Sequence, residues 1–418
     1  MEEEFCSLSN VLKTEKNKGL WSHVDAADVQ DFSEAVVEKV LAFQKTHKSY
    51  RATPLRSLDA LAGELGVSKI YVKDESYRFG LNAFKVMGGI YAIANCLAEK
   101  LGLPIEALSF EKLKTKKVRE QIGDLTFISA TDGNHGRGIA WIARELGLKS
   151  VIRMPKGSSQ RRLESIQAEG ADVAISDVNY DDTVRICEQM ARENGYLMIQ
   201  DTSWPGYEEI PLWIMQGYAA IAKEISDQLP EAPTHIFLQA GVGSYAGGIS
   251  GYFLHKYPDA PPKIILVEPN QADCYFKSFE QKDGAMQSVG GDMATIMAGL
   301  ACGEPNRAAY AFLSKYSYGA LSCSDDVTAL GMRIYGNPLR GDDQVISGES
   351  GAVTMGALYL LCAEAGFAAD KNKLAIDDTS RILLISTEGD TDKQSYHDIV
   401  WKGRYPNLIG KSRDELNV

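Results

Sequence analysis

The sequence predicts an α/β protein of two domains, each a mostly parallel sheet flanked by helices, with a cleft between them. At 418 residues the chain is long enough to bury two cores. Strand-like apolar runs alternate with helical segments, which is typical of parallel sheets covered on both faces. The alternation falls into two series, so we expect residues 1–84 and 211–418 to form a large domain and residues 85–210 a small one.

The expected elements follow the chain in this order. Residues 32–44 form an amphipathic helix, 58–65 a short helix and 68–73 a strand, and a further helix opens at Lys85. The first regular series has strands at 125–129, 149–154, 172–176 and 196–199, with helices at 138–146, 161–169 and 182–194. The second has strands at 234–239, 263–268 and 381–386, with helices at 212–229, 247–257 and 352–364. Residues 271–350 break the alternation, which indicates a lid, a dimer arm or a linker.

Composition argues against several classes of protein. The net charge is 44 − 56 = −12, which is unfavourable for binding nucleic acid. No apolar run approaches the roughly 20 residues of a membrane span. The N-terminus, Met1-Glu2-Glu3-Glu4, lacks the basic and apolar regions of a signal peptide. We therefore expect a cytoplasmic protein with no nucleic-acid or membrane partner.

Cysteine and histidine spacing argues against a metal site. The seven cysteines form no CxxC pair, and the six histidines show no HxH or HExxH spacing. Most of the cysteines are expected to be buried thiols. A bridge between Cys274 and Cys302, which flank a glycine-rich segment, stays open as an alternative.

Lys85, in the stretch Asn82-Ala83-Phe84-Lys85, has an unusual setting for a lysine. Phe84 and Val86 flank it, a glycine turn precedes it and two glycines follow. A lysine in an apolar crevice has a lowered pKa and can act as a nucleophile and base at neutral pH. Such a lysine can hold the aldehyde of pyridoxal 5'-phosphate (PLP) as a Schiff base.

A glycine-rich loop can supply the phosphate site. Gly241-Val242-Gly243-Ser244-Tyr245 follows a strand and opens a helix, so its backbone amides and the helix dipole favour a phosphate. The same loop fits a dinucleotide fingerprint, Gly241-x-Gly243-x-x-Ala246, with Glu268 as a ribose-binding residue. A dinucleotide-dependent oxidoreductase is therefore an alternative, although it leaves Lys85 without a role.

Two hydroxyl residues, Ser386 and Thr387, stand at the end of the last strand. A hydroxyl there can hydrogen-bond the pyridine nitrogen of PLP without forcing that nitrogen to be protonated. The ring is then a weaker electron sink, which favours loss of a β leaving group over transamination.

Together these motifs resemble the tryptophan-synthase-β-like (fold-type II) family of PLP-dependent enzymes, which includes serine and threonine dehydratases. The resemblance runs from about Thr53 to Asp392. It implies that PLP lies in the cleft between the domains, with Lys85 as the Schiff-base residue and Gly241 to Tyr245 around the phosphate. It also implies a loop for the substrate carboxylate, Thr131-Asp132-Gly133-Asn134-His135, in which Asn134 faces the ring oxygen of PLP. Ser386, or Thr387 as a one-residue alternative, would partner the pyridine nitrogen.

Four segments resemble one branch of this family, the diaminopropionate ammonia-lyases. They are residues 78–85, 130–138, 295–305 and 347–352. This resemblance implies conversion of 2,3-diaminopropionate, as either the D or the L isomer, to pyruvate and two ammonia molecules, by a homodimer. A serine or threonine dehydratase is the alternative within the family, and a catalytically inactive PLP-binding protein is another.

Asp132 departs from the broader dehydratase pattern, which has serine or threonine at this place. An anionic side chain beside a substrate carboxylate costs roughly 1 kcal/mol at 4 Å even in water. A substrate with a second amine gives Asp132 a use, because the carboxylate can attract a cation or accept the α-proton from the face opposite Lys85. We predict Asp132 to be the second acid–base residue; a turn or N-cap aspartate is the simpler alternative.

Overall fold

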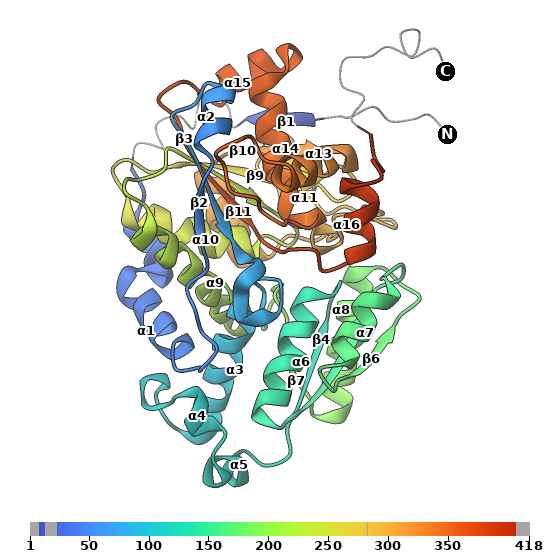
Figure 1. The fold of residues 1–418 in the computed structure, drawn as a ribbon. Coiled ribbons are helices and arrows are strands. Elements are labelled where there is room, and N and C mark those ends of the chain that lie inside the picture. Colours follow the sequence, from blue (N-terminus) through green and yellow to red (C-terminus); the bar gives the residue numbers. More distant parts are fainter. Residues whose placement is uncertain (1–7, 13–22, 282, 407–418) are drawn as a thin grey trace.

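Two sheets organise the computed structural model, which describes residues 8–12, 23–281 and 283–406 (Figure 1). The large sheet has seven strands in the order β1-β10-β9-β8-β11-β3-β2, and the small sheet has four in the order β6-β5-β4-β7. All pairs in the small sheet are parallel, and in the large sheet the edge strands β1 and β2 are antiparallel to their neighbours. The predicted fold class is confirmed.

The bounds of the elements are as follows. The strands are β1 Leu8–Leu12, β2 Leu55–Ser57, β3 Lys69–Asp74, β4 Thr126–Ala130, β5 Lys149–Met154, β6 Asp172–Ile175, β7 Leu197–Met198, β8 His235–Gln239, β9 Lys263–Pro269, β10 Ser317–Cys323 and β11 Arg381–Ser386. The helices are α1 Glu34–Gln44, α2 Asp59–Leu65, α3 Val86–Leu101, α4 Phe110–Leu113, α5 Lys116–Ile122, α6 Asn134–Leu146, α7 Gln160–Gln167, α8 Tyr180–Asn194, α9 Glu209–Gln228, α10 Ser244–Lys256, α11 Cys274–Glu280, α12 Arg307–Tyr316, α13 Asp325–Gly336, α14 Glu349–Ala363, α15 Ala368–Lys373 and α16 Lys393–Val400. Short 3-10 helices include η3 Glu75–Gly80 and η5 Ala298–Leu300.

Each face of the large sheet has its own apolar core. Along β11, Ile382 and Leu384 belong to the core shared with α2, α13 and α14, while Leu383 and Ile385 belong to the core shared with α3, α9 and α10. Alternate residues of a strand point to opposite faces, so a strand covered on both faces is apolar throughout. Because the inner strands of the large sheet are parallel, their carboxyl ends meet at one edge of the sheet, where ligands of such sheets bind.

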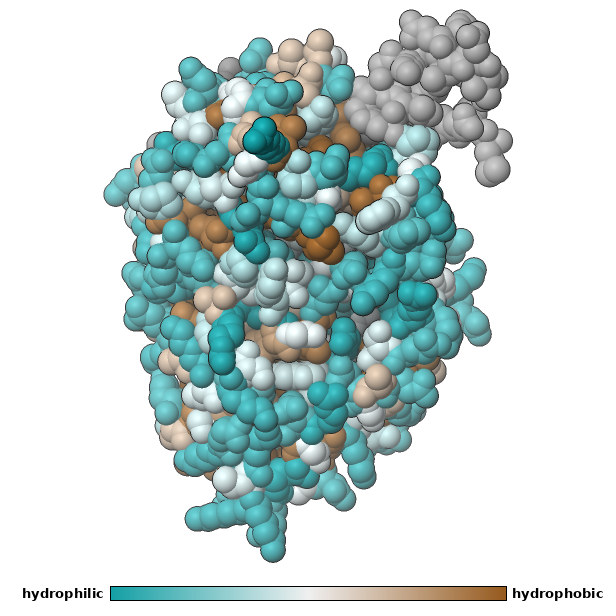
Figure 2. All heavy atoms as spheres, viewed as in Figure 1, coloured by the Kyte–Doolittle hydropathy of each residue, from teal (hydrophilic) through white to brown (hydrophobic). Residues whose placement is uncertain are grey.

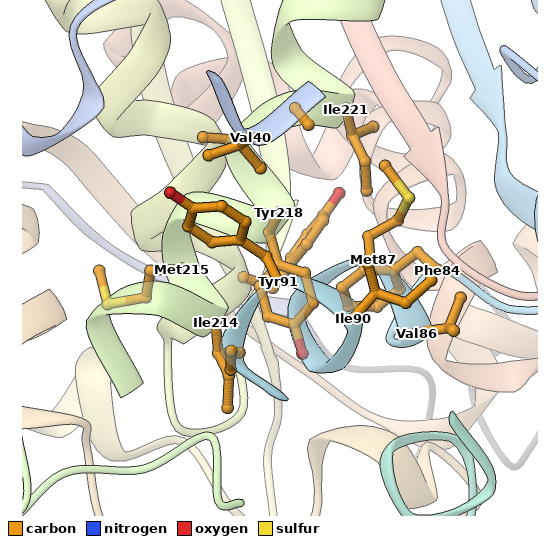
Figure 3. Packing of buried hydrophobic residues seen from close by; sticks show 14 of the residues in the cluster. Val40, Phe84, Val86, Met87, Ile90, Tyr91, Ile214, Met215, Tyr218 and Ile221 are labelled. Carbon is orange, nitrogen blue, oxygen red and sulfur yellow. The ribbon is translucent and has the colours of Figure 1, made fainter. Parts of the chain in front are cut away.

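The helix that follows Lys85 is held by close packing against α9 (Figure 3). The rings of Phe84 and Tyr218 lie 4.9 Å apart. A Cβ atom on Gly88 would lie 2.6 Å from the Tyr218 ring, and one on Gly217 would lie 2.5 Å from the Met87 carbonyl oxygen. Glycines on both helices therefore permit this approach, and the lysine is carried at the start of a helix whose position is fixed by packing.

The prediction for residues 271–350 was wrong in two parts: residues 274–280 fold as α11, and a longer part spans 307–336. This part folds as α12, β10 and α13, and β10 lies between β1 and β9 in the large sheet. Residues 283–306 have no regular structure apart from η5. Two helices also begin earlier than expected, α6 at residue 134 and α10 at residue 244, so both predicted ligand loops run directly into helix N-termini.

The surface shown in Figure 2 is mainly hydrophilic, with small hydrophobic areas between polar ones. Among the described residues no single helix is long and apolar enough to cross a membrane; α14 with the next short helices passes by length and composition as a pair bent by 90°. Most of α14 is buried. The acidic N-terminal residues 1–4 and Cys6 lie outside the described residues.

Candidate active site

A cavity lies between the carboxyl ends of the inner strands of the large sheet and the first residues of α6 from the small sheet. Each sheet and the segment between β9 and β10 contribute to its lining. The lining residues are Phe84, Lys85, Asn134, Asp201, Tyr218, Gln239, Gly241, Val242, Gly243, Ser244, Tyr245, Gly299, Leu300, Cys302, Ser350, Thr387 and Glu388. A second cavity adjoins the first. Its lining includes Asp132, which contacts Lys85 of the first cavity, and Tyr180, which contacts Asp201 of the first cavity.

Lys85 lies in the first cavity between two carboxylates. Its Nζ donates to Asp201 Oδ2 at 3.2 Å and is 4.0 Å from Asp132 Oδ1. Burial alone would lower the pKa of this lysine, but the charges of Asp201 and Asp132 raise it above its ordinary value. The expectation of a lowered pKa was therefore wrong, because the crevice is anionic and not merely apolar.

Asp201 is the residue that sequence reasoning missed. It follows β7, is buried, and accepts hydrogen bonds from Lys85 and from the Tyr180 hydroxyl at 3.1 Å. Burial would raise the pKa of its carboxyl, but Lys85 and other donors lower it to about 2, so Asp201 is ionised. Its position just after a predicted strand, at the same sheet edge as the 131–136 loop, was the available signal.

The loop after β4 is shaped by its own side chains. The Thr131 hydroxyl accepts from the backbone N–H groups of Gly133 and Gly136, each at 2.9 Å. His135 is buried, its Nε2 lies 2.9 Å from the Ile199 carbonyl oxygen, and burial lowers its pKa. Thr131, Gly133 and His135 line neither of these two cavities. Their assignment to substrate binding stays a prediction, whereas Asn134 and Asp132 do face the cavities.

The predicted phosphate loop lies on the cavity over its whole length, from Gly241 to Tyr245. Gly243 has a φ of 93°, and a Cβ atom there would lie 2.0 Å from the Tyr275 hydroxyl oxygen. Ser244 begins α10, so backbone N–H groups at a helix N-terminus face the cavity. Asn306 Nδ2 donates to Ser244 Oγ at 2.7 Å and helps to fix the loop.

The two hydroxyl residues at the end of β11 differ in exposure to the cavity. Thr387 lines it. Ser386 is fully buried, and its Oγ donates to the Glu388 carbonyl oxygen at 3.3 Å. Of the two predicted partners of a pyridine nitrogen, Thr387 is therefore the one with access.

Glu268, the ribose-binding residue of the oxidoreductase alternative, is turned inward. Its carboxyl accepts from the backbone N–H groups of Tyr275 and Phe276 at 2.9 and 2.7 Å, at the start of α11. Burial raises the pKa of this carboxyl to about 8. Cys274 and Cys302, for which a bridge was left open, are both buried free thiols.

The residues around the cavity fit PLP. Glycines at 241, 243 and 299 line the cavity, and each packs so closely against neighbouring protein atoms that a Cβ atom would lie within 3.2 Å of one of them. The buried hydroxyls of Tyr218 and Tyr245, which line the cavity, have no hydrogen-bond partner within the described part of the chain. A lysine, a helix N-terminus and an amide therefore surround a space that still has polar groups to satisfy.

Comparisons with known proteins agree with this reading. A family model described as "Pyridoxal-phosphate dependent enzyme" matches residues 47–379. The diaminopropionate ammonia-lyase of Salmonella typhimurium is 51% identical over 374 residues, which cover 88% of this chain and 93% of that protein. The chain belongs to the diaminopropionate ammonia-lyase family of PLP-dependent enzymes.

Solved structures of this family share the fold. The Escherichia coli diaminopropionate ammonia-lyase in complex with D-serine has a TM-score of 0.88 and 44% identity, covering 96% of this chain and 99% of that one. Its complex with an aminoacrylate-PLP azomethine reaction intermediate has a TM-score of 0.86 at 44% identity, with coverages of 96% and 98%. The predicted family, the PLP cofactor and the lyase class are confirmed, and the oxidoreductase alternative was wrong.

Proposed function

We propose that this protein eliminates the β-amine of 2,3-diaminopropionate, as either isomer, and releases pyruvate and two ammonia molecules. The observation that carries the proposal is the pair of carboxylates, Asp132 and Asp201, that both lie within 4.0 Å of the Lys85 amine. The names of the relatives that are about half identical to this chain support the substrate. PLP, when bound, supplies an aldehyde for amines and a ring that withdraws electrons from the substrate α-carbon.

The chain's own residues hold this cofactor in the proposal. Lys85 binds the aldehyde, the backbone N–H groups of Gly241 to Tyr245 bind the phosphate, and the Asn134 amide donates to the ring oxygen. Thr387, with Ser386 as the buried alternative, binds the pyridine nitrogen through its hydroxyl. A hydroxyl leaves that nitrogen unprotonated, which favours elimination.

Proton transfer is divided between Lys85 and Asp132. The raised pKa of Lys85 keeps a proton on its amine while the cavity holds no other cation. An ammonium group of the substrate beside Asp132 is a like charge, which lowers the lysine pKa and lets the amine act as a base. Asp132, which is also 3.8 Å from Arg162 Nη1, accepts the α-proton of the isomer that presents it to the opposite face.

The two carboxylates beside Lys85 also favour a diamine over serine or threonine. The contacts of Asp132 with Lys85 and Arg162 are long, at 4.0 and 3.8 Å, so a second ammonium group gains more here than a neutral hydroxyl does. A serine or threonine dehydratase would place the same two carboxylates against a substrate with only one ammonium group. It remains the second candidate within the family.

Product stoichiometry tests the proposal. The purified, PLP-loaded protein is given D- and L-2,3-diaminopropionate, D- and L-serine, and L-threonine, and pyruvate, 2-oxobutanoate and ammonia are measured. We expect two ammonia per pyruvate from both diaminopropionate isomers, and much slower turnover of the hydroxy amino acids. One ammonia per oxo acid, from serine or threonine as the preferred substrate, would support the dehydratase.

The proposal also covers the oligomeric state, the cellular compartment and the domain bounds. We infer a homodimer in the cytoplasm, and a small domain of residues 85–210 between the two parts of the large one, 1–84 and 211–418. The large domain then carries the phosphate loop, and the small one carries Asp132, Asn134 and Asp201.

A further inference from the structure

Glu388 is a carboxylate of the cavity that neither the motifs nor the proposed reaction has used. It follows β11, is buried, and lines the cavity. Three groups from different parts of the chain donate to it. The Ser350 backbone N–H donates to Oε1 at 3.0 Å, and the Asn134 amide and the Thr391 hydroxyl donate to Oε2. The contact with Asn134 joins the end of the large sheet to the first residue of α6.

The segment 347–352 is built to hold this carboxylate. Besides the Ser350 N–H, which fixes Oε1, the Gly348 N–H donates to the Glu388 carbonyl oxygen at 2.9 Å. A Cβ atom on Gly348 would lie 3.0 and 3.2 Å from Glu388 Cγ and Cδ. It would also lie 2.4 Å from the Gly389 carbonyl oxygen, so a larger residue at 348 would disturb the backbone next to Glu388. Contacts with Gly348, Ser350 and Thr391 therefore hold Glu388 besides its contact with Asn134.

We infer that Glu388 is a positioning residue that fixes which end of the Asn134 amide faces the cofactor. An ionised carboxylate accepts hydrogen bonds and donates none, so it selects the NH₂ end of the amide. That group has two hydrogens. One is used by Glu388, and the other stays free for the ring oxygen of PLP, which needs a donor. Without the carboxylate, the amide can rotate and present its carbonyl oxygen to another oxygen.

If Glu388 acted only through its charge, its removal would change PLP binding in the opposite direction. PLP carries an anionic phosphate, so removing a nearby carboxylate would tighten its binding. Glu349 is a matched neighbour, because it is buried in the same group of charges around Arg162 and has no hydrogen bond to Asn134 among the described contacts. Comparing Glu388→Gln with Glu349→Gln therefore separates orientation from charge.

The test is titration of cofactor-free protein with PLP, followed by visible absorbance. It uses no substrate, so it is independent of the proposed reaction. We expect Glu388→Gln to raise the Kd for PLP on the order of tenfold, since a charge-assisted hydrogen bond is lost and the amide turns. Glu349→Gln should leave Kd unchanged or lower it. Unchanged or tighter binding by Glu388→Gln would overturn the inference.

A double-mutant cycle separates positioning from a general structural role. Asn134→Ala should weaken PLP binding about as much as Glu388→Gln, and the double variant should bind no more weakly than Asn134→Ala alone. Losses that multiply would show that Glu388 acts independently of Asn134 and would overturn the inference. If Glu388→Gln fails to fold, Glu388→Asp retains the charge and shortens the reach. Its Kd should also rise, and an unaltered Kd would overturn the inference.

Hydrogen exchange of the cofactor-free protein gives a readout without PLP. The amides of residues 131–140 should exchange several-fold faster in Glu388→Gln than in the unaltered protein, because the contact between the sheets is broken. Glu349→Gln should leave this segment unchanged. Equal exchange in all three proteins would show that Glu388 does not hold Asn134.

Discussion

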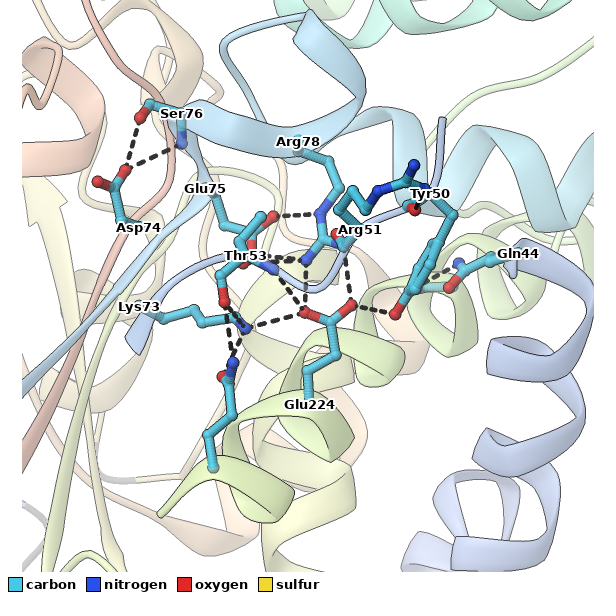
Figure 4. Close-up of polar contacts among 12 residues, drawn as sticks. Gln44, Tyr50, Arg51, Thr53, Lys73, Asp74, Glu75, Ser76, Arg78 and Glu224 are labelled. Atoms are coloured by element: carbon cyan, nitrogen blue, oxygen red, sulfur yellow. Dashed lines mark hydrogen bonds and ion pairs between the residues drawn. The ribbon is translucent and has the colours of Figure 1, made fainter. Parts of the chain in front are cut away.

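Two buried groups of charges in this molecule differ in how closely they are paired. The first, between β3, η3 and α9, joins Lys73, Glu75, Arg78 and Glu224 (Figure 4). Its ion pairs are 2.8 to 2.9 Å long, and its two cations balance its two anions. The second surrounds Lys85, whose contacts with Asp201 and Asp132 are 3.2 and 4.0 Å long, and Asp132 also lies 3.8 Å from Arg162 Nη1.

The difference separates a structural role from a functional one. Every charge of the first group has a close partner, and Thr53 and Tyr50 take up further hydrogen-bonding positions. Arg78 thereby fixes the segment that leads to Lys85. In the second group the ion pairs are longer, and the group faces a cavity. A buried polar group costs free energy of folding unless it is hydrogen-bonded. The second group therefore lowers the stability of the fold unless charges of a bound ligand complete its pairing.

The largest effect on turnover is expected when Lys85, the central cation of the second group, is removed. Lys85→Ala should reduce turnover of diaminopropionate at least on the order of 10,000-fold, because no other amine can hold the cofactor or move the proton. Circular dichroism should show an unaltered fold. Borohydride reduction and peptide mapping of the unaltered protein should place the label on Lys85. A label on Lys73, which is buried in the first group, or on Lys156 would contradict the assignment.

Asp132→Asn tests whether the second group provides a second base. The substitution keeps the shape and removes the basicity, which typically costs on the order of 100- to 10,000-fold. We expect this loss in kcat/KM chiefly for the D isomer, since Lys85 remains for the L isomer. Asp172→Asn is the control, because Asp172 is an exposed carboxylate of the small sheet, and it should lose little kcat/KM on either isomer. Equal, small losses of kcat/KM on both isomers would show that Asp132 is a turn or N-cap aspartate and not a base.

Glu224→Gln tests the first group. It leaves Lys73 and Arg78 without a full partner, and breaking such a buried pair costs about 3–5 kcal/mol. Asp343→Asn, in an exposed pair with Arg56, should cost below about 1 kcal/mol. Chemical denaturation measures both. If Glu224→Gln costs no more than Asp343→Asn, the first group does not stabilise the fold.

The same residue predicts a pH dependence. Burial would raise the pKa of Glu224, but Arg78 and Lys73 lower it to about 2, against an ordinary value of 4.5. A group whose pKa is lower in the folded state stabilises the fold above its unfolded pKa and loses that contribution as pH falls. The unaltered protein should therefore lose stability between about pH 5 and 2, and Glu224→Gln should lose less over this range.

Sequence reasoning predicted those residues of the candidate site that have a local signature. Lys85, the Gly241–Tyr245 loop and Asn134 each stand in a motif beside a strand end. Asp201 was missed because Ile199-Gln200-Asp201 is an ordinary strand end, and its contact with Lys85 joins residues 116 positions apart. The first group of charges was missed for the same reason, since Glu224 is 146 residues from Arg78.

The errors in the fold have a similar origin. β10 reads Ser-Tyr-Gly-Ala-Leu-Ser-Cys, with no β-branched residue, so its strand depends on the neighbours β1 and β9. The start of α6, Asn-His-Gly-Arg-Gly, has glycines that are unfavourable in a helix. Gly138 is used for packing, because a Cβ atom there would lie 3.1 Å from Val86 Cα at the start of α3. Tertiary contact overrides local preference in both cases.

The smallest expected effect distinguishes the two hydroxyls at the end of β11. Thr387 faces the cavity, so Thr387→Val, which keeps the shape, should remove one hydrogen bond to PLP. Such a bond contributes about 1 kcal/mol, which corresponds to roughly fivefold in Kd. Ser386→Ala removes only the contact with the Glu388 carbonyl oxygen and should change the Kd less than about twofold. Titration of cofactor-free protein with PLP measures both, and a larger loss in Ser386→Ala would assign the pyridine nitrogen to Ser386. That result would also mean that the hydroxyl paired with the Glu388 carbonyl oxygen, and not the one that lines the cavity, is the functional group.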